Sequence, residues 1–162
     1  MNFSESGYLL SFTEHSNLAY VGILGEAFSG CRSLQYRNIV LVVDDDHGML
    51  EGLARLLRQH DYKPVLFLSA QAFKTHTDFE SAICVVLDID LKDGSGIELR
   101  HRLKADSIFV PVIYITGNDD PAVRKAALAS GCIALLIKPF SAQELIEALK
   151  RAGRHPDSGD IL

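Results

Sequence analysis

Four short apolar segments of this chain each end in side chains that could do chemistry. In chain order, the residues at these ends are Asp44-Asp45-Asp46, Asp88, Thr116 and Lys138. If the segments are parallel strands, their carboxyl ends share one edge of a sheet, which is where α/β folds place their ligand sites. Carboxylates, a hydroxyl and an amine would then meet at that edge. We therefore predict a metal-binding site that handles phosphate.

The elements that would position these side chains alternate from about residue 37 onward. Short β-branched runs alternate with helical stretches, which is typical of βαβ units and a parallel sheet. The runs are apolar almost throughout, as expected for strands covered on both faces. Right-handed crossovers between them would give an α/β fold, a doubly wound, five-stranded sandwich. The predicted strands are 38–43, 63–67, 82–87, 111–115 and 133–137. Three of the predicted helices are 47–59, 70–76 and 95–104. A fourth helix runs from Pro121 to a stop near Gly131, and a fifth starts with the capping box at Ser141.

The length of 162 residues allows one domain with a substantial core and some additional chain. Residues 1–36 do not continue the alternation, and they contain four glycines and one basic residue. We predict a poorly structured N-terminal extension there, with one short helix near 18–28. The folded domain is predicted over residues 37–152, followed by a flexible C-terminal tail at 153–162.

Composition and charge limit the functional classes. The formal net charge of -5 gives no electrostatic reason to expect direct nucleic-acid binding. No apolar stretch is long enough to span a membrane, and the N-terminus lacks the basic region of a signal peptide. Cys31, Cys84 and Cys132 have no metal-ligand spacing, so we predict reduced thiols, which fit a reducing compartment. A cytoplasmic protein that binds no membrane is expected.

Together, the four motifs resemble the response-regulator receiver domain of two-component signalling. The resemblance covers about residues 38–152 and implies a CheY-like, flavodoxin-type (βα)5 fold with strand order 2-1-3-4-5. Each motif alone has a more ordinary explanation, because an aspartate after a strand is often only a helix cap and a lysine is usually solvated. The occurrence of all four motifs in this order is far more specific for the family than any one of them. They are Val43-Asp44-Asp45-Asp46, Leu87-Asp88 with Gly96 eight residues later, Ile115-Thr116-Gly117 and Lys138-Pro139-Phe140.

The resemblance assigns the phosphoacceptor and the metal ligands. Asp88 would take a phosphoryl group from a phosphohistidine and hold it as an acyl phosphate. Asp44, Asp45 and Asp88, with the backbone carbonyl of Asp90, would hold Mg²⁺. Three carboxylates in one cleft repel one another unless a cation is present, and hard oxygen ligands suit Mg²⁺, which also binds phosphate oxygens.

The resemblance also assigns roles to the lysine and the threonine. Lys138 would pair with a phosphoryl oxygen, aimed into the site by the family's cis peptide bond to Pro139. Thr116 would donate a hydrogen bond to the phosphoryl group only in the modified state, which would connect the chemistry to a conformational switch. Asp46 is expected outside the site as the N-cap of the first helix.

Three positions depart from the family's usual pattern. Lys92 stands where a proline is common, which predicts a less rigid loop. Leu135 stands where an aromatic residue is common, which argues against the family's usual coupling of that ring to the threonine. Asp90 and Asn118 occupy the two positions that shape the access of water to the acyl phosphate. A carboxylate at position 90 could strengthen metal binding or repel the phosphoryl group, and the sequence leaves both open.

Two other functions compete with the phosphoacceptor. Asp88-Ile89-Asp90 also resembles the nucleophile motif of Mg²⁺-dependent, haloacid-dehalogenase-type phosphatases, in which Asp90 would be the general acid. Only 74 residues follow Asp88, however, and no acidic motif follows Lys138 to hold the metal. The second alternative is a binding module that keeps the fold and signals without phosphorylation, which Leu135 leaves open. We predict a regulatory phosphoacceptor rather than an enzyme with turnover.

The predicted partners follow from the resemblance. The phosphoryl donor would be a histidine kinase or a histidine phosphotransfer protein. A downstream protein would be the target, because the predicted tail is too short for an output domain. The family's usual signalling surface corresponds to about residues 119–152, and the sequence leaves open whether a homodimer forms through it.

Overall fold

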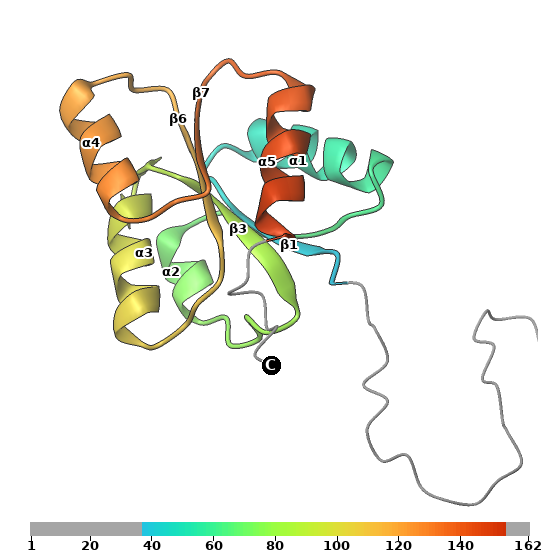
Figure 1. Cartoon of the computed structure of the whole chain (residues 1–162), viewed down its shortest axis with the longest axis horizontal. Coiled ribbons are helices and arrows are strands. Elements are labelled where there is room, and N and C mark those ends of the chain that lie inside the picture. Colours follow the sequence, from blue (N-terminus) through green and yellow to red (C-terminus); the bar gives the residue numbers. More distant parts are fainter. Residues whose placement is uncertain (1–36, 155–162) are drawn as a thin grey trace, which may run out of the picture. The chain divides into compact units, whose positions relative to one another are not determined.

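The structure, a computed structural model, describes residues 37–154. The predictions for residues 1–36, including Cys31, and for the tail beyond residue 154 lie outside this range. At the centre is a five-stranded parallel sheet (Figure 1). Its order, β2-β1-β3-β6-β7, confirms the predicted 2-1-3-4-5 arrangement. The strands are β1 (Ile39–Val43), β2 (Lys63–Phe67), β3 (Ala82–Asp88), β6 (Val112–Thr116) and β7 (Ala134–Ile137).

Within residues 37–154, five helices cover the two faces of the sheet. They are α1 (His47–Gln59), α2 (Ala70–Lys74), α3 (Gly96–Ala105), α4 (Pro121–Ala129) and α5 (Ala142–Ala152). Apolar residues of α1 and α5 pack with one face in one core cluster, and those of α2, α3 and α4 pack with the other face in a second cluster. Every residue of β3 is buried. Asp88, the last residue of this central strand, is therefore held by packing on both faces.

Helix caps fix where the helices next to the site begin. The side chain of Asp46 accepts a hydrogen bond from the backbone N–H of Met49 at 3.0 Å, which confirms it as the N-cap of α1. Ser141 and Glu144 form the predicted capping box of α5. The second helix ends at Lys74, two residues earlier than predicted. The Thr75 hydroxyl donates to the carbonyl of Ala72 at 2.8 Å, a local bond that competes with continuation of the helix.

A two-stranded antiparallel ribbon lies between β3 and α3. It consists of β4 (Asp90–Leu91) and β5 (Gly94–Ser95), joined by Lys92 and Asp93. The sequence predicts only a turn here, because strands of two residues are too short to show any periodicity. The ribbon gives the loop after Asp88 a defined backbone.

Cys84 and Cys132 are free cysteines, and Cys84 is fully buried. Burial raises the pKa of the Cys84 thiol far above its usual value, so it stays protonated.

Within residues 37–154, none of the helices has the length and apolar character that a membrane span requires.

Candidate functional site

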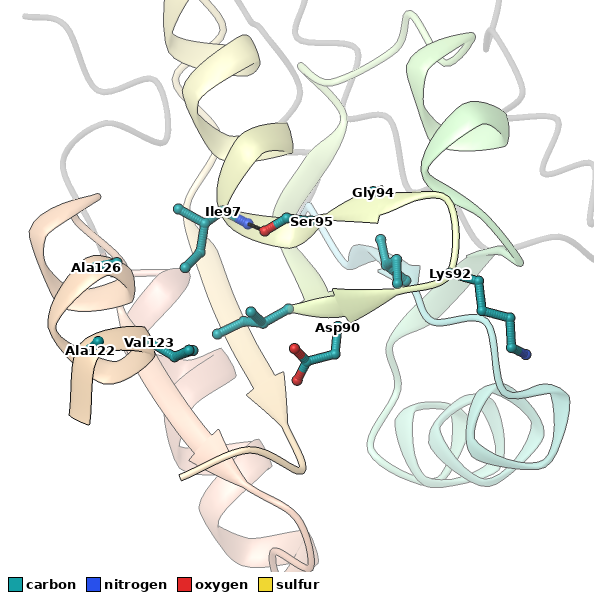
Figure 2. A pocket seen from close by; sticks show the side chains of 10 residues that line it. Asp90, Lys92, Gly94, Ser95, Ile97, Ala122, Val123 and Ala126 are labelled. Carbon is teal, nitrogen blue, oxygen red and sulfur yellow. Dashed lines mark hydrogen bonds between the residues drawn. The ribbon is translucent and has the colours of Figure 1, made fainter. Parts of the chain in front are cut away.

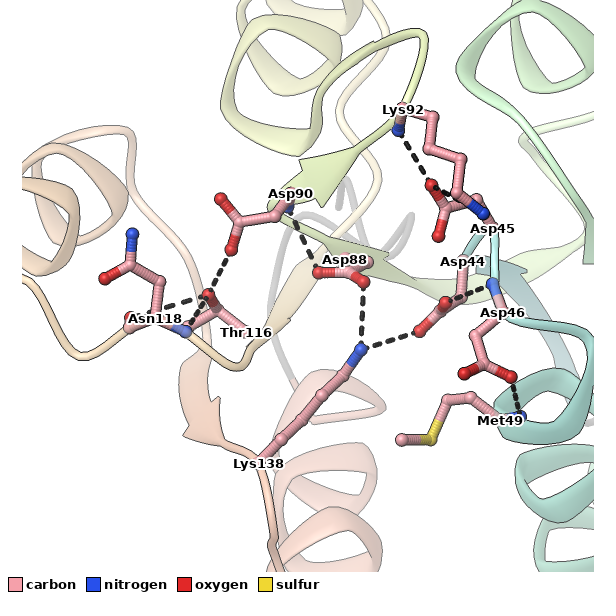
Figure 3. Close-up of polar contacts among 10 residues, drawn as sticks. All are labelled: Asp44, Asp45, Asp46, Met49, Asp88, Asp90, Lys92, Thr116, Asn118 and Lys138. Carbon is pink, nitrogen blue, oxygen red and sulfur yellow. Dashed lines mark hydrogen bonds and ion pairs between the residues drawn. The ribbon is translucent and has the colours of Figure 1, made fainter.

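Side chains from the carboxyl ends of four strands converge at one edge of the sheet (Figure 3). The sequence predicted this convergence because parallel strands present their carboxyl ends together. Asp44 is fully buried and Asp88 is 5% exposed. Carboxylate oxygens of Asp44, Asp45 and Asp88 all lie within 4.8 Å of one another. The three predicted acidic ligands are thus brought into one cluster.

Lys138 bridges two of these carboxylates. Its Nζ lies 2.9 Å from Asp44 Oδ2 and 2.9 Å from Asp88 Oδ2, although the three residues come from three different strand ends. The peptide bond between Lys138 and Pro139 is cis, as the family resemblance implies. The lysine therefore supplies the positive charge that holds two acidic groups side by side.

The electrostatic balance at Asp88 favours additional positive charge. Burial has the largest effect and raises the pKa of Asp88, and the nearby charge of Asp44 adds to it. Hydrogen bonds from Lys138 and from the backbone N–H of Asp90 act in the opposite direction but do not cancel it. For Lys138, partial burial alone would lower the pKa, but the bonds to Asp88 and Asp44 outweigh it, and the pKa is raised. The lysine therefore stays charged, and the surroundings of Asp88 still favour further positive charge.

The donor set fits a hard divalent cation. Three clustered carboxylates offer oxygen ligands, and the excess negative charge around Asp88 would favour an ion such as Mg²⁺. The predicted contribution of the Asp90 carbonyl stays a prediction. His47, which follows the acidic run, lies outside the cluster and contacts Glu51 at 3.2 Å on α1.

The hydroxyl of Thr116 has a partner that the sequence did not predict. Thr116 Oγ1 donates to Asp90 Oδ2 at 2.8 Å, and it accepts a hydrogen bond from the backbone N–H of Asn118 at 3.0 Å. The Asp90 backbone N–H in turn donates to Asp88 Oδ1 at 3.1 Å. Asp90 therefore connects the central carboxylate with the predicted switch hydroxyl.

The loop that carries Lys92 is tied to its neighbours by hydrogen bonds. The Lys92 backbone N–H donates to Asp45 Oδ2 at 2.7 Å, and its Nζ lies 3.8 Å from the same oxygen. A proline at this position has no N–H and could not make the first bond. On the other side, Asp93 accepts hydrogen bonds from the backbone N–H groups of Ala70 and Gln71, each at 2.9 Å. The restraint that proline would give is replaced here by bonds to Asp45 and α2.

We expect Asp93→Ala to lower the thermal midpoint at neutral pH by roughly 5 °C, because two N–H groups at the start of α2 lose their acceptor. The bonds from Gln71 and Ala70 lower the pKa of Asp93. Its contribution should therefore be complete above the unfolded pKa of about 4 and disappear as the pH falls through the lowered value. Differential scanning fluorimetry from neutral to acidic pH checks this. Asp106→Ala is the control, since Asp106 contacts Arg102 only at 3.8 Å on the surface; equal midpoints for the two variants would contradict the prediction.

Gly96 allows α3 to begin directly against the central strand. A Cβ built at Gly96 would overlap the backbone carbonyl oxygen of Asp88 and lie 3.1 Å from its carbonyl carbon. The Gly96 N–H donates to the carbonyl of Ile89 at 3.1 Å, which fixes this close approach. Position 96 therefore has to be glycine because there is no room for a Cβ against the Asp88 backbone, not because its backbone angles are unusual.

Leu135 on β7 pairs with Tyr114 on the adjacent strand β6. Tyr114 is fully buried, and its hydroxyl lies 2.9 Å from Ser130 Oγ. Burial raises the pKa of Tyr114 to about 12, so the phenol is neutral. The ring is held at the end of α4 by its bond to Ser130 and lies on the strand next to Leu135, so Tyr114 does not take the place of an aromatic residue at position 135.

An open groove is lined by Asp90 and its neighbours (Figure 2). Its volume is about 590 Å³, and it runs between the β4–β5 ribbon and α4. Asp90 and Lys92 are polar residues of its wall, whereas Ile97 and Val123 contribute apolar surface. The groove leaves the Asp90 side of the cluster accessible.

Comparison with known proteins decides the family. The family model described as the response regulator receiver domain matches residues 40–150, which contain the whole acidic cluster, Thr116 and Lys138. This chain belongs to the response-regulator receiver family. The receiver assignment explains why the four motifs occur together, in this order and at these strand ends.

Individual relatives agree with the assignment. Over 114 residues, this chain is 36% identical to nodulation protein W of Bradyrhizobium diazoefficiens. The matched region covers 70% of this chain and 50% of that protein. The crystal structure of FixJ-N is similar with a TM-score of 0.64 and 30% identity, over 72% of this chain and 94% of that one. The BeF3-activated DrrB receiver domain is similar with a TM-score of 0.63 and 27% identity, and the match covers 72% of this chain and 97% of that one. This chain spans about half the length of the curated relatives it matches.

Proposed function

We propose that this receiver domain accepts a phosphoryl group on Asp88 from a histidine kinase or a histidine phosphotransfer protein, and that the modification switches its binding to a downstream protein. One observation carries the proposal. Lys138 Nζ lies 2.9 Å from the carboxylates of both Asp88 and Asp44, so a cation and an acidic cluster surround a single central carboxylate. Such a site is suited to a nucleophile that must hold a highly charged group.

The chemistry needs few parts from the protein. A carboxylate oxygen of Asp88 forms a bond to phosphorus while the bond from phosphorus to the imidazole nitrogen of the donor breaks, and the imidazole leaves with the electron pair and takes up a proton. Lys138 is placed to move from the Asp88 carboxylate to a phosphoryl oxygen, since both are acceptors for the same ammonium. Thr116 is the expected donor to another phosphoryl oxygen.

Asp44, Asp45 and Asp88, with the Asp90 carbonyl, would hold Mg²⁺. When bound, the ion neutralises charge on the phosphoryl group and on the acidic cluster. Without it, Asp44 and Asp88 share the single positive charge of Lys138. We therefore expect the reaction to depend on the ion.

The first experiment is the intact mass of the protein after incubation with acetyl phosphate and Mg²⁺. Wild type should gain one phosphoryl group, because acetate can leave from phosphorus as the imidazole does. The adduct should be absent in Asp88→Ala and in samples treated with EDTA. Asp93→Ala is a matched control, because it removes a carboxylate from the same loop but outside the cluster, and it should still be modified. If no adduct forms even after rapid acid quenching, the phosphorylation-independent binding module becomes the better proposal.

Signalling would use the surface of about residues 119–152, which includes α4, β7 and α5, and a homodimer would use the same surface. The free thiols of Cys84 and Cys132 support a cytoplasmic location. The acidic pair Asp44-Asp45 precedes Asp88 in the chain, as in the receiver pattern and unlike the phosphatase motif, and the Asp90 side chain already accepts a hydrogen bond from Thr116. We therefore propose a regulatory phosphoacceptor without turnover of other substrates.

A further inference from the structure

The Thr116 hydroxyl is engaged before any phosphoryl group arrives (Figure 3). The side chain is fully buried, and its Oγ1 lies 2.8 Å from Asp90 Oδ2. The alternative acceptor, the carbonyl oxygen of Asn118, is farther away at 3.4 Å. A hydroxyl has only one proton, so a bond to the Asp90 carboxylate excludes a bond to a phosphoryl oxygen. A charged acceptor also makes this bond stronger than an ordinary one.

The backbone of Asp90 is fixed, while its side chain is free to release the hydroxyl. The backbone N–H donates to Asp88 Oδ1 at 3.1 Å, and Asp90 pairs with Ser95 in the β4–β5 ribbon. Lys92 and Asp93 hold the turn of the same ribbon by bonds to other elements. The Asp90 side chain, by contrast, is exposed. Release of Thr116 therefore requires rotation of one exposed side chain and no movement of the loop.

We propose that Asp90 is a latch on the switch: its carboxylate holds the Thr116 hydroxyl in the unmodified protein and gives it up when the phosphoryl group forms on Asp88. This inference rests on the proposed function and adds a regulatory element to the same site. The latch stabilises the unmodified state, because the phosphoryl group must displace a charge-assisted hydrogen bond before it can use the hydroxyl. The Asp90 carboxylate also repels the negatively charged phosphoryl group, so both effects act in one direction.

A phosphoryl mimic separates the two effects in a double-mutant cycle. Beryllofluoride is the probe, as in the BeF3-activated DrrB receiver domain. Its apparent affinity is measured by NMR titration at saturating Mg²⁺ for wild type, Asp90→Asn, Thr116→Val and the double variant. Asp90→Asn keeps the size of the side chain and an acceptor oxygen but removes the charge. Asp119→Asn is the matched control, because Asp119 pairs with Arg124 and makes no bond to Thr116.

We expect Asp90→Asn to bind beryllofluoride about tenfold more tightly than wild type, the effect of weakening one charge-assisted hydrogen bond. In the Thr116→Val background, the increase in beryllofluoride affinity caused by Asp90→Asn should fall below about threefold. Without the hydroxyl, only the repulsion between the Asp90 carboxylate and the mimic is left to be removed. Asp119→Asn should stay within about twofold of wild type. The Mg²⁺ affinity is measured separately and should fall by no more than about threefold, because the predicted ligand from residue 90 is its backbone carbonyl and only a neighbouring charge is lost.

Each other outcome has a definite meaning. Equal gains in both backgrounds would show that repulsion alone acts, and would overturn the latch. An unchanged affinity in Asp90→Asn would also overturn it, while the proposed function would stand because wild type binds the mimic. If neither wild type nor any variant binds beryllofluoride at saturating Mg²⁺, the proposed function fails and the latch fails with it.

Discussion

Lys138→Met should lower the free energy of unfolding by about 3 kcal/mol when Mg²⁺ is removed by EDTA. The reason is that Asp44 is fully buried and has its cationic partner in Lys138 Nζ at 2.9 Å. Methionine keeps most of the apolar stem but leaves the Asp44 and Asp88 carboxylates without positive charge. Addition of Mg²⁺ should recover part of the loss, because the ion would interact with the same carboxylates. Urea denaturation with EDTA and with Mg²⁺ measures both quantities.

The pH dependence of this effect has a definite sign. The bonds to Asp88 and Asp44 raise the pKa of Lys138 despite its partial burial. A raised lysine pKa means that the stabilisation is fully present below the unfolded pKa of about 10.4 and is lost only as the pH rises through the higher folded value. The difference between wild type and Lys138→Met should therefore be constant from about pH 7 to about pH 9.

The control for this variant is Lys92→Met. Lys92 Nζ lies 3.8 Å from Asp45 Oδ2, and its side chain is 82% exposed. Solvent screens such a pair, so its loss should change the unfolding free energy by less than about 1 kcal/mol. Similar losses for the two variants, or no effect of Mg²⁺ on Lys138→Met, would contradict the assignment of Lys138 as the cation that balances the buried cluster.

Gly96→Ala should destabilise the protein by about 2 kcal/mol and slow phosphorylation of Asp88 at least about tenfold. A Cβ at Gly96 would overlap the carbonyl oxygen of Asp88, and the obstructing atoms belong to backbone that cannot rotate away. Either α3 or the end of β3 must move, and β3 carries the nucleophile at its last residue. The two readouts are urea denaturation and the initial rate of phosphoryl incorporation from acetyl phosphate, followed by intact mass.

The same substitution at Gly52 should have the opposite effect. Gly52 lies within α1, and a Cβ there would meet nothing within 4 Å. Alanine is a better helix former than glycine, so Gly52→Ala should stabilise the protein by about 1 kcal/mol and leave the phosphorylation rate unchanged. If the two variants behave alike, the close approach of Gly96 to Asp88 is not what positions the nucleophile.

The sequence determined the fold and the members of the acidic cluster, and the reason is periodicity together with position. Runs such as Ile83–Leu87 are apolar throughout, so they predict strands that are buried on both faces. Parallel strands bring their carboxyl ends to one edge whatever the detailed packing, so Asp44, Asp88 and Lys138 could be placed together from chain order alone. Local cap signals, such as Ser141 with Glu144, fixed helix starts in the same way.

Which polar groups bond to one another is visible only in the folded protein. The Thr116 hydroxyl donates to Asp90, 26 residues away in the chain, and Asp93 accepts from the start of α2, 23 residues away. The Lys92 N–H donates to Asp45 across 47 residues. Such bonds depend on loop conformation and side-chain rotamers, which leave no repeating pattern in the sequence. The sequence therefore identified the parts of the site, whereas the pairing that makes Asp90 the partner of the switch hydroxyl exists only because the folded loops bring the two side chains together.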